Sequence, residues 1–134
     1  MDDQQHCRLS VSGGELELAG PPAALRALSE LLRCEVEPVE VPTEGGTVAQ
    51  EITDGPLLVG LNDTTLRLTG GRTYLDIVWD ALDGVAEEVE TADHRGVNRH
   101  QHIEYYRGDQ YRSPDSLPLI ILADWPDEPA RNTR

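Results

Sequence analysis

The feature that most constrains the fold is an apolar pattern that occurs twice, at an offset of 50 residues and without a gap. The matching pairs are Leu16 with Leu66, Leu18 with Leu68, Gly20 with Gly70, Leu25 with Leu75, Leu28 with Val78, and Leu32 with Leu82. Leu is abundant in the chain and any two hairpin–helix units share such a pattern, so coincidence is the alternative. We predict a duplicated ββαβ unit with halves at about 7–55 and 56–124.

The first half begins with a β-hairpin and a helix. Residues 7–19 alternate between apolar and polar around the turn at Gly13-Gly14. Pro21-Pro22 favours the start of a helix, whose buried stripe would be Leu25, Leu28 and Leu32. Val36, Val39 and Val41 indicate an edge strand, because Pro38 lies within it. We expect residues 42–55 to form a loop with at most a short strand around Val48.

The second half repeats this pattern. Residues 57–61 and 66–68 flank a turn at 62–64, and a helix is predicted over 73–90. Its apolar seam is Leu75, Val78, Leu82, Val85 and Val89, widened by Trp79 and Ala86. Two strands follow at 100–106 and 117–122, and residues 125–134 should form a flexible tail. The predicted class is α+β: one domain over 1–124, a two-layer sandwich with an antiparallel sheet and both helices on one face.

The charge of the chain excludes some partners. It has 134 residues with 25 Asp and Glu against 11 Arg, a net charge of −14. This excess argues against binding nucleic acid or an anionic membrane.

No apolar run reaches the length that spans a bilayer, and residues 1–5 do not resemble a signal peptide. With Cys7 and Cys34 far apart, we predict a cytoplasmic protein with two free thiols.

The acidic excess lies in two segments without Arg, residues 34–66 and 73–93, each with seven acidic residues. On the second predicted helix, Asp76, Asp80, Asp83 and Glu87 form a stripe away from the apolar seam. Like charges at this spacing repel, so reversing Asp80 and Asp83 to Arg should leave thermal stability equal or higher. The stripe is either a solvated face or a docking surface for a basic partner. In the second case the predicted contacts are Asp76, Trp79 as a partly exposed anchor, Asp80, Asp83, Glu87, Glu44 and Glu51.

Signs of catalysis are few. The chain has no glycine-rich phosphate loop between a strand and a helix, and no Gly-x-Ser-x-Gly motif. His100, His102 and Glu104 would share one face of a strand, so they are the candidate metal ligands. His94 could add a ligand, but an ordinary surface or interface strand explains the same pattern. We therefore predict no enzyme activity, no cofactor and no resident metal.

The stretch from His100 to Gly108 and the Pro-containing final strand form a distinctive motif, with its positions at His100, His102, Glu104, Tyr105, Tyr111 and Pro118. Through this motif, residues 56–123 resemble a family of small actinobacterial proteins, immunity protein family 32 of bacterial polymorphic toxin systems. It implies a cytoplasmic, non-catalytic protein that binds and neutralises a toxin domain. Since toxin nuclease domains are often basic, this agrees with the charge argument.

Two hypotheses follow. The first is an immunity-type inhibitor that presents an acidic surface to a basic toxin, as a monomer or homodimer. The second is a metal-binding or small-ligand domain built on His100, His102 and Glu104. A weaker third possibility is dimerisation through the predicted edge strand at 36–41.

Overall fold

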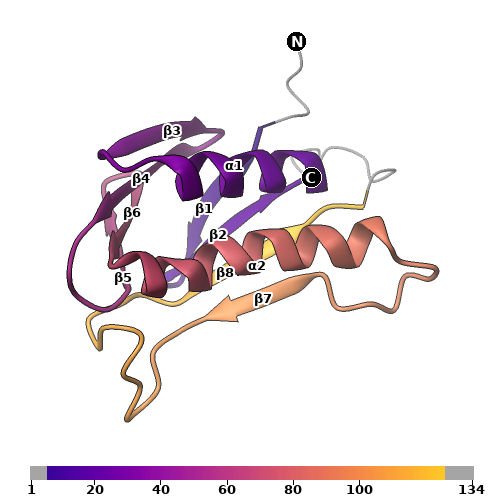
Figure 1. The fold of residues 1–134 in the computed structure, drawn as a ribbon. Coiled ribbons are helices and arrows are strands. Elements are labelled where there is room, and N and C mark those ends of the chain that lie inside the picture. Colours follow the sequence, from indigo (N-terminus) through magenta and orange to yellow (C-terminus); the bar gives the residue numbers. More distant parts are fainter. Residues whose placement is uncertain (1–5, 126–134) are drawn as a thin grey trace.

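The computed structural model describes residues 6–125 and contains two helices and eight strands (Figure 1). The first half contains β1 (Arg8–Ser12), β2 (Glu15–Gly20), α1 (Pro22–Cys34), β3 (Val39–Thr43) and β4 (Gly46–Ile52). The second half repeats the order with β5 (Leu58–Asn62), β6 (Thr65–Gly70), α2 (Arg72–Glu90), β7 (His100–Ile103) and β8 (Leu119–Ala123). The predicted α+β class is confirmed. Each half has one strand more than the predicted ββαβ unit.

The strands form two four-stranded sheets, where the sequence predicted one. Their orders are β1-β2-β8-β7 and β3-β4-β6-β5. Each sheet therefore joins a hairpin of one half to a hairpin of the other. The central pairs, β2 with β8 and β4 with β6, are parallel, and all other pairs are antiparallel. The topology thus has an approximate two-fold symmetry that exchanges the halves.

Strand β4 lies inside its sheet, although we predicted a loop with at most a short strand there. Gly45 and Gly46 are typical of a loop in the sequence. In the structure, glycine is needed at both positions because neighbouring backbone lies too close to allow a side chain. Gly45 has a positive φ of 89°, and a Cβ on either glycine would collide with backbone atoms of Leu9 or Thr64. The tight β3–β4 turn can therefore lie against β1 and against the β5–β6 turn.

The two sheets also meet at their edges. Beside β1, Leu9 N donates to Glu44 O (2.8 Å), and Glu44 N donates to Cys7 O (2.9 Å). Beside β5, Leu57 N donates to Tyr111 O (2.9 Å), and Ser113 N donates to Leu57 O (2.7 Å). In each half, a later segment therefore bonds to the backbone at or just before the first strand of the hairpin.

One apolar core lies between the helices and the inner faces of the sheets. The predicted buried residues of both helices are in it, with exposed fractions of 5% or less. Figure 1 shows α1 and α2 running side by side in front of the strands. The predicted tail lies outside the described residues except for Trp125, which packs against the core beneath the guanidinium of Arg95. Neither described helix is long and apolar enough to cross a membrane.

Candidate partner-binding surfaces

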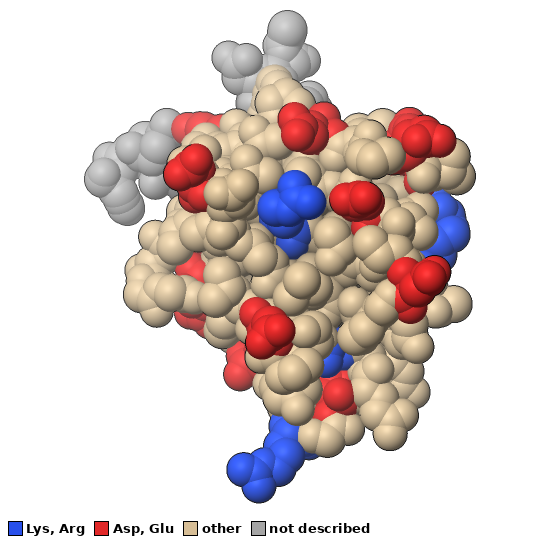
Figure 2. Space-filling model, turned by 90° about the vertical axis from the view of Figure 1, so that its left-hand side faces the viewer, with Lys and Arg blue, Asp and Glu red and all other residues tan. Residues whose placement is uncertain are grey.

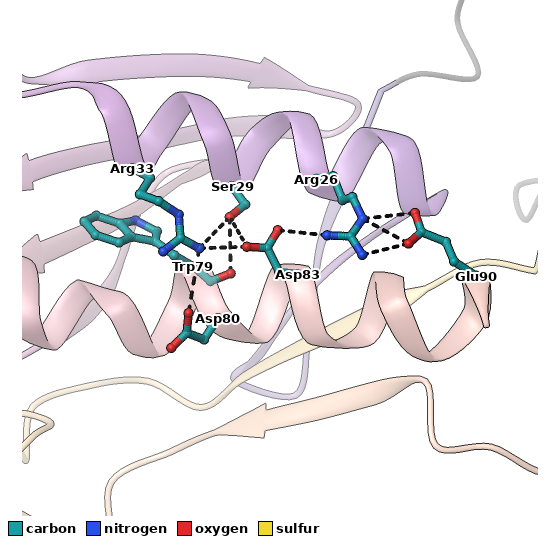
Figure 3. A network of polar contacts seen from close by, with 7 residues as sticks. All are labelled: Arg26, Ser29, Arg33, Trp79, Asp80, Asp83 and Glu90. Atoms are coloured by element: carbon teal, nitrogen blue, oxygen red, sulfur yellow. Dashed lines mark hydrogen bonds and ion pairs between the residues drawn. The ribbon is translucent and has the colours of Figure 1, made fainter. Parts of the chain in front are cut away.

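The acidic stripe of α2 faces the arginines of α1 (Figure 3). Arg33 Nη2 donates to Asp83 Oδ2 at 2.7 Å, and Ser29 Oγ donates to the same oxygen at 3.1 Å. Near the C-terminal end of α2, Arg26 binds both carboxylate oxygens of Glu90, with its shortest contact at 2.7 Å. The expectation that repulsion along the stripe is uncompensated is therefore wrong, because the compensating charges come from the other helix.

The repeat explains why these charges meet. Arg26 and Arg33 occupy the positions that correspond, 50 residues later, to Asp76 and Asp83. The reciprocal pairs are both present: Arg26 lies 3.8 Å from Asp83, and Arg33 lies 3.8 Å from Asp76. Ser29 Oγ also lies 3.2 Å from the carbonyl oxygen of its own equivalent, Trp79, which shares the one hydroxyl proton with Asp83. The approximate two-fold axis therefore passes between the helices, and the two copies carry opposite charges across it.

Trp79 is not the partly exposed anchor that the stripe hypothesis required. Its side chain is 2% exposed, and Nε1 donates to Gln50 Oε1 at 2.8 Å. Gln50 is itself buried and donates from Nε2 to the carbonyl of Leu32. The Trp79 side chain therefore faces the interior and is part of the apolar seam of α2. Its neighbour Asp80 is 73% exposed and lies 3.7 Å from Arg33.

The acidic residues of segment 34–66 have a different environment. Six of the seven, Glu35, Glu37, Glu40, Glu44, Asp54 and Asp63, make no ion pair with any residue in 6–125. Glu51 lies 3.8 Å from Arg67. Figure 2 shows the side on which Figure 1 draws β3 to β6, and acidic side chains are spread over it with few basic ones between them. Of the thirteen acidic residues in 6–125 that form no ion pair, six therefore lie on this segment.

Three exposed acidic residues of this segment lie along the edge strand β3. We call these residues, Glu37, Glu40 and Glu44, the acidic edge. Glu37 precedes the strand, Glu40 lies on it, and Glu44 lies in the turn that follows. Strand β3 is the outer strand of its sheet, so its outer side has no hydrogen-bonded neighbour among the described strands. The backbone of Glu44 is fixed by its bonds to Cys7 and Leu9, which holds this carboxylate where the two sheets meet.

The predicted metal candidates lie on an outer sheet face. In the register of β7 and β8, His100 lies beside Leu122 and His102 lies beside Ile120, and their rings are 5.1 Å apart. Glu104 is exposed just after the strand. Among residues 6–125, no three His, Cys, Asp or Glu side chains are grouped so that they could hold a metal ion. His94 instead approaches Asp93 at 3.5 Å.

The other motif positions lie in the segment between β7 and β8. Pro118 O accepts a hydrogen bond from Leu16 N (3.0 Å), Tyr105 is half-buried, and the ring of Tyr111 lies 6.3 Å from that of Tyr74. Asp109 was not among the predicted site residues, although its side chain is fully buried. Its Oδ1 accepts from the backbone of Tyr111, and its Oδ2 accepts from Arg112 at 3.1 Å. The Gly108-Asp109 turn pair was the available signal.

Two further buried groups are structural. Arg8 binds Asp124 through two hydrogen bonds of 2.7 and 3.0 Å, and this contact is the main cause that raises the pKa of Arg8. Beside it, burial raises the pKa of the Cys7 thiol to about 12, so the thiol is protonated at neutral pH. A protonated, buried thiol is a poor nucleophile, which argues against a catalytic role for Cys7.

Comparison with known families supports the resemblance. Residues 65–124 match the model of the family described as Immunity protein 32. The match runs from β6 to the end of β8 and contains α2 and all six motif positions. No curated protein and no solved structure matches the chain. The match suggests an immunity-type function, in a class of proteins that is generally non-catalytic.

Proposed function

We propose that this chain, whose residues 65–124 match Immunity protein 32, binds a basic toxin domain and neutralises it through an acidic surface without catalysing a reaction. The observation that carries the proposal is the acidic edge, three exposed carboxylates without an ion-pair partner in residues 6–125. Carboxylates that are not neutralised within the protein attract a cationic surface and raise its association rate.

The acidic edge is a better docking surface than the α2 stripe. A basic partner that approached Asp83 would compete with Arg33 and Ser29 and would have to break their bonds to it. No such cost applies at Glu37 or Glu40. We therefore assign the docking surface to the acidic edge. Asp80 and Glu87 are exposed on α2 and lie outside this surface. Asp76, Asp83 and Trp79 hold the helix pair together.

The two cysteines fit the proposed place of action. Cys7 and Cys34 are both free, and Cys34 is exposed. An exposed free thiol persists in a reducing compartment, which is the cytoplasm. A cytoplasmic inhibitor would meet its toxin domain after delivery or before export.

The test uses a toxin domain that is identified, by its toxicity to growing cells, among the reading frames beside the gene for this chain. The variant carries Glu37→Arg and Glu40→Arg, and its matched control carries Glu87→Arg and Glu88→Arg, which changes the net charge equally on α2. We expect the first variant to slow association at least about tenfold and to fail to protect growing cells, while the control stays within about threefold of wild type. Association should also slow as salt is raised.

Two results would overturn the proposal. One is full protection by the Glu37→Arg, Glu40→Arg variant with an unchanged, salt-independent association rate. The other is loss of protection in the α2 control alone, which would return the docking surface to the helix. Thermal unfolding of both variants shows that each is folded before binding is compared.

A further inference from the structure

An apolar pocket of about 230 Å³ lies between α1 and β3. Helix α1 contributes Ala27, Leu28 and Leu31, and β3 contributes Val41 and Thr43. Cys7, which precedes β1, also lines the pocket. Leu31 is 39% exposed although it is a large apolar side chain, so the described residues leave this pocket open to solvent.

The repeat provides an internal comparison for the pocket. On α2, the positions equivalent to Ala24 and Ala27 are occupied by Tyr74 and Ile77. Both of these larger side chains pack against the core, and Tyr74 also meets the ring of Tyr111. In the second half, Tyr74 and Ile77 therefore fill the space beside their helix. In the first half, the two smaller alanines leave the equivalent space empty. The fold accepts a large apolar group at this position.

Two acidic residues adjoin the pocket lining in the sequence, since Glu30 precedes Leu31 and Glu44 follows Thr43. Glu40 alternates with Val41 and therefore lies on the opposite face of β3. All three are exposed and form no ion pair within the described range. Glu44 N also donates to Cys7 O, which places Glu44 at the end of the pocket formed by Cys7. An apolar cavity with an acidic rim is complementary to an apolar side chain that has cationic neighbours.

We propose that this α1–β3 pocket receives an aromatic or aliphatic side chain from an Arg- or Lys-rich segment of the basic partner. The inference rests on the proposed function and adds an anchor to it, since Glu44 of the acidic edge lies beside the Cys7 end of the same pocket. Carboxylates at the rim attract the segment, and burial of one apolar side chain in the pocket holds it. The partner's segment would occupy the place that Tyr74 and Ile77 fill in the second half.

The pocket is tested with three synthetic peptides, Ac-Arg-Arg-Phe-Arg-Arg-NH2, its Ala analogue in place of Phe, and Ac-Glu-Glu-Phe-Glu-Glu-NH2. Amide chemical shifts of the full chain are followed by NMR during titration. We expect the Phe peptide to shift residues of α1 and β3 around the pocket and to bind about tenfold more tightly than the Ala peptide. The acidic peptide should cause no shifts there, because the rim repels it.

Two matched variants separate the pocket from the surrounding charge. Ala27→Tyr fills the pocket, whereas Ala23→Tyr places the same side chain at an exposed position of α1 outside the lining. With Ala27→Tyr the Phe and Ala peptides should bind equally, and with Ala23→Tyr their tenfold difference should persist. Thermal unfolding confirms that both variants are folded.

Several outcomes would overturn the inference. These are equal binding of the Phe and Ala peptides by wild type, contacts of residues 1–5 in the pocket by NMR, or a dimer in sedimentation that Ala27→Tyr abolishes. Full growth protection by Ala27→Tyr would show that the toxin does not use the pocket, while the proposed function stands. Failure of wild type to protect, with intact peptide binding, would instead reject the proposed function.

Discussion

The α2 stripe and the acidic edge look alike in the sequence but differ in the structure. Each belongs to a segment with seven acidic residues and no Arg. In space, the stripe lies against Arg26 and Arg33 of α1, whereas Glu37, Glu40 and Glu44 have no ion-pair partner within residues 6–125. A run of like charge in a sequence therefore does not by itself identify a binding surface. What matters is whether another element brings the opposite charge.

The repeat accounts for the difference. Two identical helices packed about a two-fold axis would place Arg against Arg or Asp against Asp at the positions near the axis. Here the first copy has Arg26 and Arg33 where the second has Asp76 and Asp83, so the same geometry brings opposite charges together. The acidic edge lies along β3, outside the helix pair, and gains no such partner within residues 6–125.

The largest predicted effect comes from reversing the stripe at its most contacted residue. Asp83→Arg removes the bonds from Arg33 and Ser29 and places a third guanidinium beside Arg26 and Arg33. We expect the free energy of unfolding to fall by about 2–3 kcal/mol. Urea unfolding followed by circular dichroism measures this. This expectation differs from the one drawn from the sequence, in which reversing Asp80 and Asp83 together leaves thermal stability equal or higher.

The control is the swapped pair. Adding Arg33→Asp to Asp83→Arg restores opposite charges, and we expect it to recover about 1 kcal/mol of the loss. No recovery in the double variant, or no loss in the single one, would show that the stripe is solvated after all. The two regions would then be equivalent, and the comparison between them would fail.

The sequence predicted the local structure well because local patterns determine it. Alternating strands around Gly13-Gly14 and residues 62–64, and the apolar periodicity of both helices, correspond to β1–β2, β5–β6, α1 and α2. It failed where the determining contact is distant. Strand β4 contains Gly46, which is required by a close approach to Thr64, and buried Gln50, which is satisfied by Trp79 and Leu32. Neither requirement is visible within the segment itself.

The candidate site, too, could be predicted from the sequence only where distant contacts do not determine it. The acidic segments and the motif around His100 and His102 could be located from the sequence, and the family match agrees with that motif. The pairing of the stripe with α1 could not, because it depends on how two helices 50 residues apart pack. The offset of the repeat did contain a clue, since it aligns Arg26 with Asp76 and Arg33 with Asp83.

A smaller effect is expected at Trp79, which separates a core role from a binding role. Trp79→Phe leaves the buried Oε1 of Gln50 without its donor, so we expect a loss of roughly 1–2 kcal/mol in the free energy of unfolding. Partner affinity should not change once the variant is folded. A stable variant with weakened binding would make Trp79 an anchor and would return the docking surface to α2.

Reversal of the acidic edge should hardly affect stability. Glu37→Arg with Glu40→Arg breaks no ion pair of the described chain and lowers a large negative net charge. We expect the free energy of unfolding to stay within about 0.5 kcal/mol of wild type. Chemical denaturation beside Asp83→Arg makes the contrast direct. A loss as large as that of Asp83→Arg would mean that the edge, too, is a structural element.

The smallest effect is the pH dependence of the pair between Arg26 and Glu90. The hydrogen bond from Arg26 lowers the pKa of Glu90 below its ordinary value of 4.5 in the folded chain. The stabilisation is therefore complete above pH 4.5 and is lost as the pH falls through the lowered pKa. Glu90→Gln should be less stable than wild type at pH 7, and the difference should shrink towards pH 3. Because both side chains are partly exposed, added salt should also reduce it. A difference that is constant with pH and salt would show that Arg26 does not neutralise this end of the stripe, and that only its centre at Asp83 differs from the acidic edge.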